Sequence, residues 1–290
     1  MSGNKLTTSL KALLKAPHAR GSALPAPSPV RTKALFDGIS LAAKSKGLAH
    51  DTWLTLSTAA LVTLNSPATL CELYSYATKD LKEEAGAVER AAIMREVGLK
   101  CISFSGIPRT INSLGALRSH LPESVASQLN IKGTRLPTPS TTDEITGPRA
   151  LSLWNSIYAP HHEKLLLKLS LSHPDLPIHI LSSHYGALLS DPPLPPIPGH
   201  YKIGRVLTSV VAIACLRAQQ GVTPQVTSHV FGLKKALEEG SEGEGVRGEE
   251  WLTSDEGCEW VLRSVDEIVR EVSGGMGSFA SLSEVRESKL

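Results

Sequence analysis

The sequence predicts an all-α fold, and three observations support this. Apolar residues recur at helical spacing through most of the chain. Strand signals are nearly absent, because there is no sustained alternation of apolar and polar residues and no Asn-Gly hairpin turn. Ser-Pro and Thr-Pro pairs stand where amphipathic segments begin, as at helix starts. We therefore expect helices over residues 32–46, 50–65, 68–83, 87–104, 109–120, 147–158, 160–172, 176–189, 204–219, 224–239 and 254–272.

These helices fall into two groups that echo each other, residues 32–121 and residues 149–275. In the first group the apolar segment LSTAALVTLN is followed by Ser66-Pro67 and an amphipathic segment. In the second, LTSVVAIACLRAQQG is followed by Thr223-Pro224 and another amphipathic segment. We expect Ser or Thr to cap each second helix, with Pro at its first position. The pattern predicts a bundle built from two related helical halves.

Two segments without helical periodicity complete this organisation. Residues 122–148 are rich in Pro, Thr and Ser and are expected to link the halves. Residues 240–250 (GSEGEGVRGEE) are acidic and Gly-rich, with few apolar side chains. We expect this acidic loop to be mobile.

The tail over residues 276–290 ends in Ser288-Lys289-Leu290. Ser-Lys-Leu at a free C-terminus is the address that a peroxisomal import receptor binds. The preceding residues are rich in Ser, Glu and Arg, so the tail is expected to project into solvent. We therefore predict a location in the peroxisome matrix, with the import receptor as a partner.

Residues 1–31 are expected to form a basic, flexible arm. The first 36 residues hold six Lys or Arg side chains and no Asp or Glu. Leucines near helical spacing over residues 5–16 are also typical of a mitochondrial transit peptide. We favour the arm, because an import signal at the other end would be useless after mitochondrial import. Dual targeting stays open.

Composition excludes several classes of function. The formal net charge of +2 and the 4% aromatic content argue against nucleic-acid binding. The longest apolar run, residues 206–216, is shorter than the roughly 18 residues that a membrane span needs. The four cysteines are scattered without a CxxC pair or a zinc-type cluster. We expect reduced thiols, no metal site and no cofactor.

The segment MREVGLKCISFSGIPRTINSLGAL, residues 94–117, is the richest in candidate chemistry. Glu96 lies on an otherwise apolar helix, with Lys100 one turn further on, so a simple surface ion pair is one interpretation. The Ser105-Gly106-Ile107-Pro108 sequence should break the helix and start another. Arg109 would then stand in the first helical turn, where its guanidinium can grip a carboxylate.

This segment resembles the carboxymuconolactone decarboxylase and alkylhydroperoxidase D-like superfamily. The matching residues are Glu96-Val97-Gly98-Leu99, then Phe104-Ser105-Gly106-Ile107-Pro108, and Asn112. The stretch from Gln225 to Gly232 is similar to the family helix that ends in His, a variable pair and Gly. With its Ser-Lys-Leu tail, the chain resembles fungal peroxisomal members of this superfamily. The resemblance implies an all-α fold of two helical halves and a homo-oligomer.

Departures from the family pattern limit the chemistry. The two cysteines of the peroxidase branch correspond to Val222 and Gln225, and its glutamate to Val210, so the dithiol of that branch is missing. The histidine of the decarboxylase branch is replaced near Tyr74 or Tyr76. Both family activities are therefore disfavoured.

The remaining candidates suggest acid–base chemistry on a small metabolite that bears a carboxylate. In this hypothesis Glu96 and His229 exchange protons beside a carbonyl, and Arg109 holds the carboxylate. The helix before the Pro-rich turn carries two candidate pocket residues, His184 and Tyr185. Two alternatives stay open: a non-catalytic binding or scaffold protein, and a one-cysteine peroxidase that uses Cys101, with Cys215 as the other candidate thiol.

Overall fold

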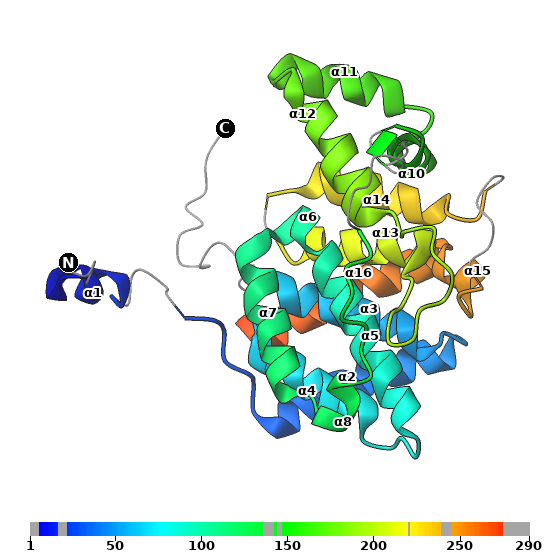
Figure 1. The fold of residues 1–290 in the computed structure, drawn as a ribbon. Coiled ribbons are helices and arrows are strands. Elements are labelled where there is room, and N and C mark those ends of the chain that lie inside the picture. The colour runs from blue at the N-terminus through cyan, green and yellow to red at the C-terminus, as the bar shows by residue number, and fades with distance from the viewer. Residues whose placement is uncertain are drawn as a thin grey trace, which may run out of the picture.

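The computed structural model describes residues 6–16, 22–135, 142–143, 147–219, 221–238 and 245–274. Every regular element within those ranges is a helix, so the predicted all-α class is confirmed. Long helices pack around one large core, and a smaller group of helices stands above it (Figure 1). In chain order the elements are α1 (Thr8–Leu14), α2 (Pro29–Ser45), α3 (His50–Thr63), α4 (Pro67–Thr78), α5 (Glu84–Lys100), α6 (Ile102–Ser105), α7 (Ile107–His120), α8 (Glu123–Ala126), α10 (Pro148–Tyr158), α11 (His162–Ser172), α12 (Asp175–His179), the π-helix η2 (Ile180–Leu189), α13 (Gly204–Arg217), α14 (Thr223–Lys234), α15 (Glu249–Leu252) and α16 (Asp255–Ser273).

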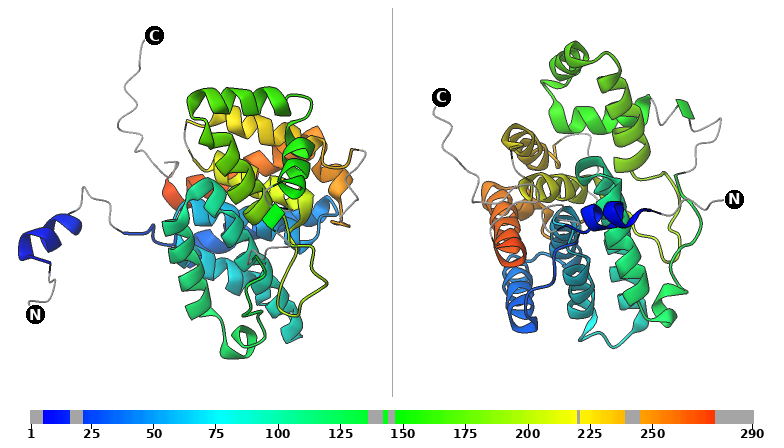
Figure 2. Two further views of the ribbon diagram at one scale, coloured as in Figure 1. Left: turned by 45° about the horizontal axis from the view of Figure 1, so that its top comes forward. Right: turned by 90° about the vertical axis from the view of Figure 1, so that its left-hand side faces the viewer.

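Helices α3 and α13 form the centre of the bundle and pack against each other. Every residue of α3 from Thr52 to Thr63 is buried, and so is every residue of α13 from Val206 to Leu216. Both helices mix Leu and Val with Ala, Ser and Thr, so neighbouring helices can cover them on all sides. Helices α2, α4, α5, α14 and α16 surround this pair (Figures 1 and 2).

The two Pro-containing junctions have the expected position but a different capping chemistry. Asn65 has a positive φ angle of 55° directly after the cap of α3, and Gly221 has one of 75° in the loop between α13 and α14. Pro stands at the first or second position of the next helix in both cases. The predicted Ser/Thr caps were wrong. Ser66 makes no capping bond and instead contacts the Thr69 hydroxyl at 2.8 Å, while Thr223 is the first residue inside α14.

The upper group consists of α10, α11, α12 and η2, and it has a small core of its own around Trp154, Ile157 and Tyr185. The sequence predicted one continuous helix over residues 176–189, but the structure divides it into α12 and the wider π-helix η2. Neither α11 nor α12 contains a buried residue, and both stand out from the bundle at the top of Figure 1.

Other boundaries also shift. The helix predicted over residues 87–104 breaks at Cys101, which separates α5 from the single turn of α6. Gly106 then adopts a φ of 83° before α7 begins, as its predicted helix-breaking role requires. The predicted basic arm contains α1, which has no buried residue and lies apart from the bundle (Figure 1). The predicted linker contains α8, whose Val125 and Ala126 are buried.

The acidic loop and the tail are described only in part. Residues 240–244 and 276–290 lie outside the described residues, and these include the Ser-Lys-Leu sequence. The last part of the acidic loop packs on the core, because Val246 is buried and Gly248 sits against Leu48. Across the described ranges, no helix is long and apolar enough to cross a membrane.

Candidate functional site

Three of the predicted site residues come together in one cavity, which we call the aromatic cavity. It has a volume of about 520 Å³ and lies between α6, α10, α11, η2 and α14. His229 comes from α14, and His184 and Tyr185 come from η2. The other lining residues are mostly aromatic or aliphatic: Ser103, Phe104, Trp154, Tyr158, Leu165, Lys168, Leu169, Ser172, Ile180, Leu189, Leu216, Pro224, Gln225 and Ser228.

Close packing of α14 on α10 places His229 beside Tyr158. A methyl group added at Gly232 would lie 2.8 Å from Cγ2 of Ile157, so only glycine permits this approach of the two helices. His229 lies about one turn before that contact and is only 4% exposed. Its ring packs at an edge-on angle against Tyr158 and Phe104, with centroids 5.7 and 5.8 Å away.

A chain of hydrogen bonds links Tyr185, Tyr158 and His229. The two phenol oxygens are 2.7 Å apart, and the Tyr158 oxygen is 3.1 Å from Nε2 of His229. Burial raises the pKa of both tyrosines, so both hydroxyls keep their protons. Both protons find an acceptor only if Tyr185 donates to Tyr158 and Tyr158 donates to Nε2. The imidazole proton then resides on Nδ1.

His229 is a neutral hydrogen-bond donor in this arrangement. Burial, assisted by the nearby positive charge of Arg205, lowers the pKa of His229 from 6.5 to about 3. Nδ1 is buried and has no hydrogen-bond partner among the described residues. An unsatisfied buried donor costs about 1–3 kcal/mol.

Arg205 connects the helices that carry the hydrogen-bonded residues Tyr158 and His229. Its guanidinium donates to the carbonyl oxygens of Ser156 and Gly232 at 3.1 and 2.8 Å, and to the Ser209 hydroxyl at 2.5 Å. These bonds tie α13 to α10 and α14, the two helices that carry Tyr158 and His229.

His184 is the second imidazole of the cavity. Its Nδ1 lies 3.1 Å from the Ser103 hydroxyl on α6. Partial burial, with a smaller effect of neighbouring His179, lowers the pKa of His184, which favours the neutral base. His184 and Tyr185 are consecutive residues of the π-helix, a helix type that is often found at functional sites. Lys168 from α11 adds a cation to the lining.

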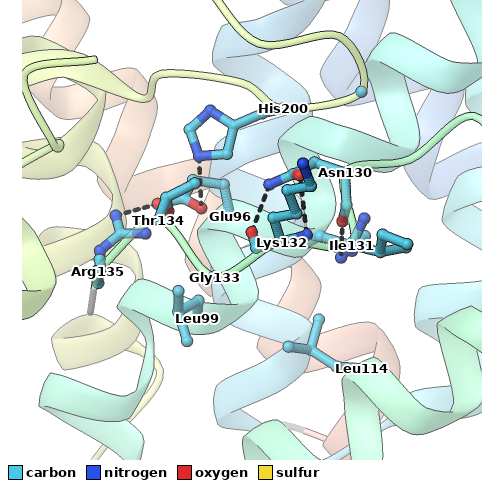
Figure 3. Close-up of a pocket in the computed structure, with 12 residues that line it drawn as sticks. Glu96, Leu99, Leu114, Asn130, Ile131, Lys132, Gly133, Thr134, Arg135 and His200 are labelled. Atoms are coloured by element: carbon cyan, nitrogen blue, oxygen red, sulfur yellow. Dashed lines mark hydrogen bonds and ion pairs between the residues drawn. The ribbon is translucent and has the colours of Figure 1, made fainter.

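Glu96 lines a different cavity of about 450 Å³, which we call the Glu96 cavity (Figure 3). Its carboxylate forms an ion pair with Arg135 and lies 3.7 Å from Nε2 of His200. The predicted Glu96–Lys100 surface pair is wrong. Lys100 is fully buried and turns away to Asp191, whose Oδ1 lies 2.8 Å from the Lys100 nitrogen.

The buried Lys100–Asp191 pair connects three helices. Lys100 also donates to the carbonyl of Leu189, the last residue of η2, where a cation is favourable. Oδ2 of Asp191 accepts a bond of 2.6 Å from the amide of Gly204, the first residue of α13. The pair thus joins α5, the end of η2 and the start of α13.

The structure therefore does not bring Glu96 and His229 together, because they line separate cavities. Arg109 lines neither cavity. It donates to the carbonyl of Thr63 at 2.5 Å, at the C-terminal end of α3, where a cation is electrostatically favourable. Cys101 is fully buried beside α6. The hypothesis that Glu96, His229 and Arg109 share one substrate is replaced by a site centred on the two histidines.

Tyr158, Trp154, Phe104 and Arg205 complete the site and were not predicted as site residues. Tyr158 precedes Ala159-Pro160, a helix end visible in the sequence, and Phe104 falls in the segment that resembles the superfamily motif. Neither the helix end nor the motif indicates that Tyr158 would contact His229, because the two residues are 71 positions apart in the chain. Within the described part of the chain, no group of His, Cys, Asp and Glu side chains is arranged to hold a metal ion.

The chain is similar to a protein named Peroxisomal protein 2 from Saccharomyces cerevisiae (strain ATCC 204508 / S288c). The two are 30% identical over an alignment of 173 residues, which covers 53% of this chain and 57% of the yeast protein. The chain thus spans little more than half the length of the relative it matches. No family model matches the sequence. No solved structure matches it either.

Proposed function

We propose that this chain is a peroxisomal matrix protein that binds a small carbonyl compound with a carboxylate and moves a proton next to that carbonyl. The similarity to a yeast protein named for the peroxisome supports the location, as does the Ser288-Lys289-Leu290 sequence. The cavity that joins two imidazoles with an aromatic wall supports the chemistry.

The hydrogen-bonded chain from Tyr185 to His229 carries the proposal. It fixes the imidazole proton of His229 on Nδ1, the atom that has no partner among the described residues. A neutral imidazole that donates to a carbonyl oxygen stabilises negative charge as it develops there. The low pKa of His229 is therefore an advantage, because the ring keeps this one proton and stays neutral.

His184 would accept the proton. The C–H bond beside the carbonyl breaks, its proton moves to the His184 imidazole, and its electron pair forms the enolate, whose oxygen accepts a bond from Nδ1–H of His229. Return of the proton to the same or a neighbouring carbon completes the cycle. Lys168 is the cation that would hold the carboxylate, in place of Arg109.

Solvent deuterium exchange tests this proposal without knowledge of the product. Purified protein is incubated in D₂O with a panel of small 2-oxo and 3-oxo carboxylic acids, and proton NMR follows loss of the C–H signal beside the carbonyl. We expect the chain to accelerate exchange in at least one compound. His184→Ala should reduce the rate by about 10²–10⁴-fold. His229→Ala should reduce it by about 10²–10³-fold.

Tyr158→Phe and His120→Ala are the informative controls. Tyr158→Phe keeps the ring but removes the hydroxyl that fixes the His229 tautomer, so exchange should slow at temperatures where the variant is still fully folded. His120 lies on α7, bonded to Ser75, and lines neither cavity, so His120→Ala should exchange at the wild-type rate. Compounds that raise the melting temperature but never exchange would instead favour the non-catalytic binding protein.

A further inference from the structure

Two cysteines far apart in the sequence meet inside the bundle. Sγ of Cys215 lies 3.5 Å from Sγ of Cys101, although 114 positions separate them. Both side chains are fully buried. Cys101 stands at the C-terminal end of α5, and Cys215 lies near the end of α13, so packing of these two helices creates the pair.

Polar groups surround this pair, whereas a buried cysteine is usually a small apolar core residue. The hydroxyls of Thr63 and Ser105 are 2.6 Å apart and lie beside the Cys215 sulfur. Burial raises the pKa of Cys215, but bonds from Cys101, Thr63 and Ser105 outweigh it and lower the pKa overall. Burial raises the pKa of Cys101. One sulfur is thus prepared to carry charge while its neighbour keeps the proton.

The pair lies behind the wall of the aromatic cavity. Ser103 and Phe104 of α6 line the cavity, while the next residue, Ser105, contacts the cysteine pair. On α13, Leu216 lines the cavity and Cys215 is the residue before it. Residues that neighbour the pair in the chain, on α6 and α13, therefore line the cavity.

We propose that Cys101 and Cys215 form a redox-active dithiol that closes to a disulfide when a small hydroperoxide enters from the aromatic cavity. The Cys215 thiolate attacks the outer peroxide oxygen, the O–O bond breaks, and the other oxygen leaves as an alcohol or water after taking up a proton. The Cys101 sulfur then attacks the Cys215 sulfenic acid. The S–S bond forms, the S–O bond breaks, and hydroxide leaves with the Cys101 proton as water.

The new bond would join the end of α5 to α13 and fix α6 between them. Because α6 supplies Ser103, the partner of His184, oxidation would also hold one wall of the aromatic cavity in place. The pair is assembled by tertiary packing and does not depend on a CxxC sequence.

Thiol counting and peptide mapping test the pair in the wild-type protein. The protein is exposed to excess hydrogen peroxide, denatured, and treated with N-ethylmaleimide. We expect the number of labelled cysteines to fall from four to two, and a non-reduced digest to contain one cross-linked peptide that joins Cys101 to Cys215. Four labelled cysteines after this exposure, or a cross-link that includes Cys71 or Cys258, would overturn the proposal.

Variants separate the two roles. In Cys101→Ser, Cys215 should stop at sulfenic acid, which dimedone traps. In Cys215→Ser, Cys101 should remain unlabelled by dimedone at the same peroxide dose. Cys258→Ser is the matched control: burial raises the pKa of Cys258 to about 11, and the cross-link should form as in wild type. Dimedone labelling of Cys101 in Cys215→Ser equal to that of Cys215 in Cys101→Ser would contradict the assigned order of attack.

Discussion

At the scale of single residues, His229 is the side chain on which the proposed site depends. Its burial, its bond to Tyr158 and the positive charge of Arg205 all favour one neutral form with the proton on Nδ1. The sequence indicated His229 as a candidate acid or base that exchanges protons with Glu96. The structure instead favours a fixed donor.

The lowered pKa of His229 predicts a loss of stability in mild acid. The unfolded chain takes up a proton on this histidine near pH 6.5, whereas the folded chain does so only near pH 3. Between these values the unfolded state binds more protons, so the free energy of unfolding decreases as the pH falls. We expect this histidine alone to contribute about 3 kcal/mol of loss between pH 7 and pH 4.

Urea unfolding of wild type and His229→Gln at several pH values measures this effect. The variant should show a flatter dependence between pH 4 and pH 6.5, whatever its absolute stability. Burial also lowers the pKa of His50 and His184, so some slope should remain. His120→Gln should keep the wild-type slope. Equal slopes in wild type and His229→Gln would mean that the folded state protonates His229 near its ordinary pKa.

At the scale of elements, the end of the π-helix determines how the two cavities are built. Leu189 closes η2 and lines the aromatic cavity, while its carbonyl accepts a bond from Lys100 on α5. Two residues later, Asp191 binds Lys100, lies 3.7 Å from Arg135, and accepts from the first amide of α13. The C-terminal end of η2 is thus held on the central bundle by the ion pair between Lys100 and Asp191.

Removal of one member of this buried pair should be costly. Lys100→Met keeps much of the side-chain volume but leaves the negative charge of Asp191 without its fully buried partner. We expect a loss of about 3–5 kcal/mol in the free energy of unfolding. The matched control is Arg217→Met, which breaks the half-exposed Arg217–Asp266 pair and should cost under about 1 kcal/mol.

Chemical denaturation at neutral pH gives both values. A loss for Lys100→Met no larger than that for Arg217→Met would show that Asp191 is well stabilised without the lysine. It would also contradict the role given to the pair in joining α5, η2 and α13.

At the scale of the whole molecule, two largely buried helices, α3 and α13, organise the bundle. The predicted relation between the two helical halves stays a prediction. The predicted homo-oligomer stays a prediction. Leu167, Leu171 and Ile178 on α11 and α12 are 67%, 88% and 63% exposed, and they form the apolar surface at which such an assembly can first be tested by substitution.

The proposed location predicts an import phenotype. A fluorescent protein fused to the N-terminal side should collect in peroxisomes, and deletion of Leu290 should leave it diffuse, since the receptor needs the whole tripeptide. Peroxisomal import that survives this deletion would rule out Ser-Lys-Leu as the signal. A second fusion carries only residues 1–31 on the same reporter and tests whether this arm is a mitochondrial signal. Mitochondrial fluorescence of this fusion would establish dual targeting.

The sequence by itself determined the helical class, because the recurrence of apolar residues at helical spacing is a local property of the chain. It also located the helix break at Gly106, since a positive φ favours glycine, and it singled out His184, Tyr185 and His229. Only the tertiary structure decided which of these residues meet. Tyr158 reaches His229, Cys101 reaches Cys215 and Lys100 reaches Asp191 across 71, 114 and 91 positions, through contacts between helices that no local pattern specifies.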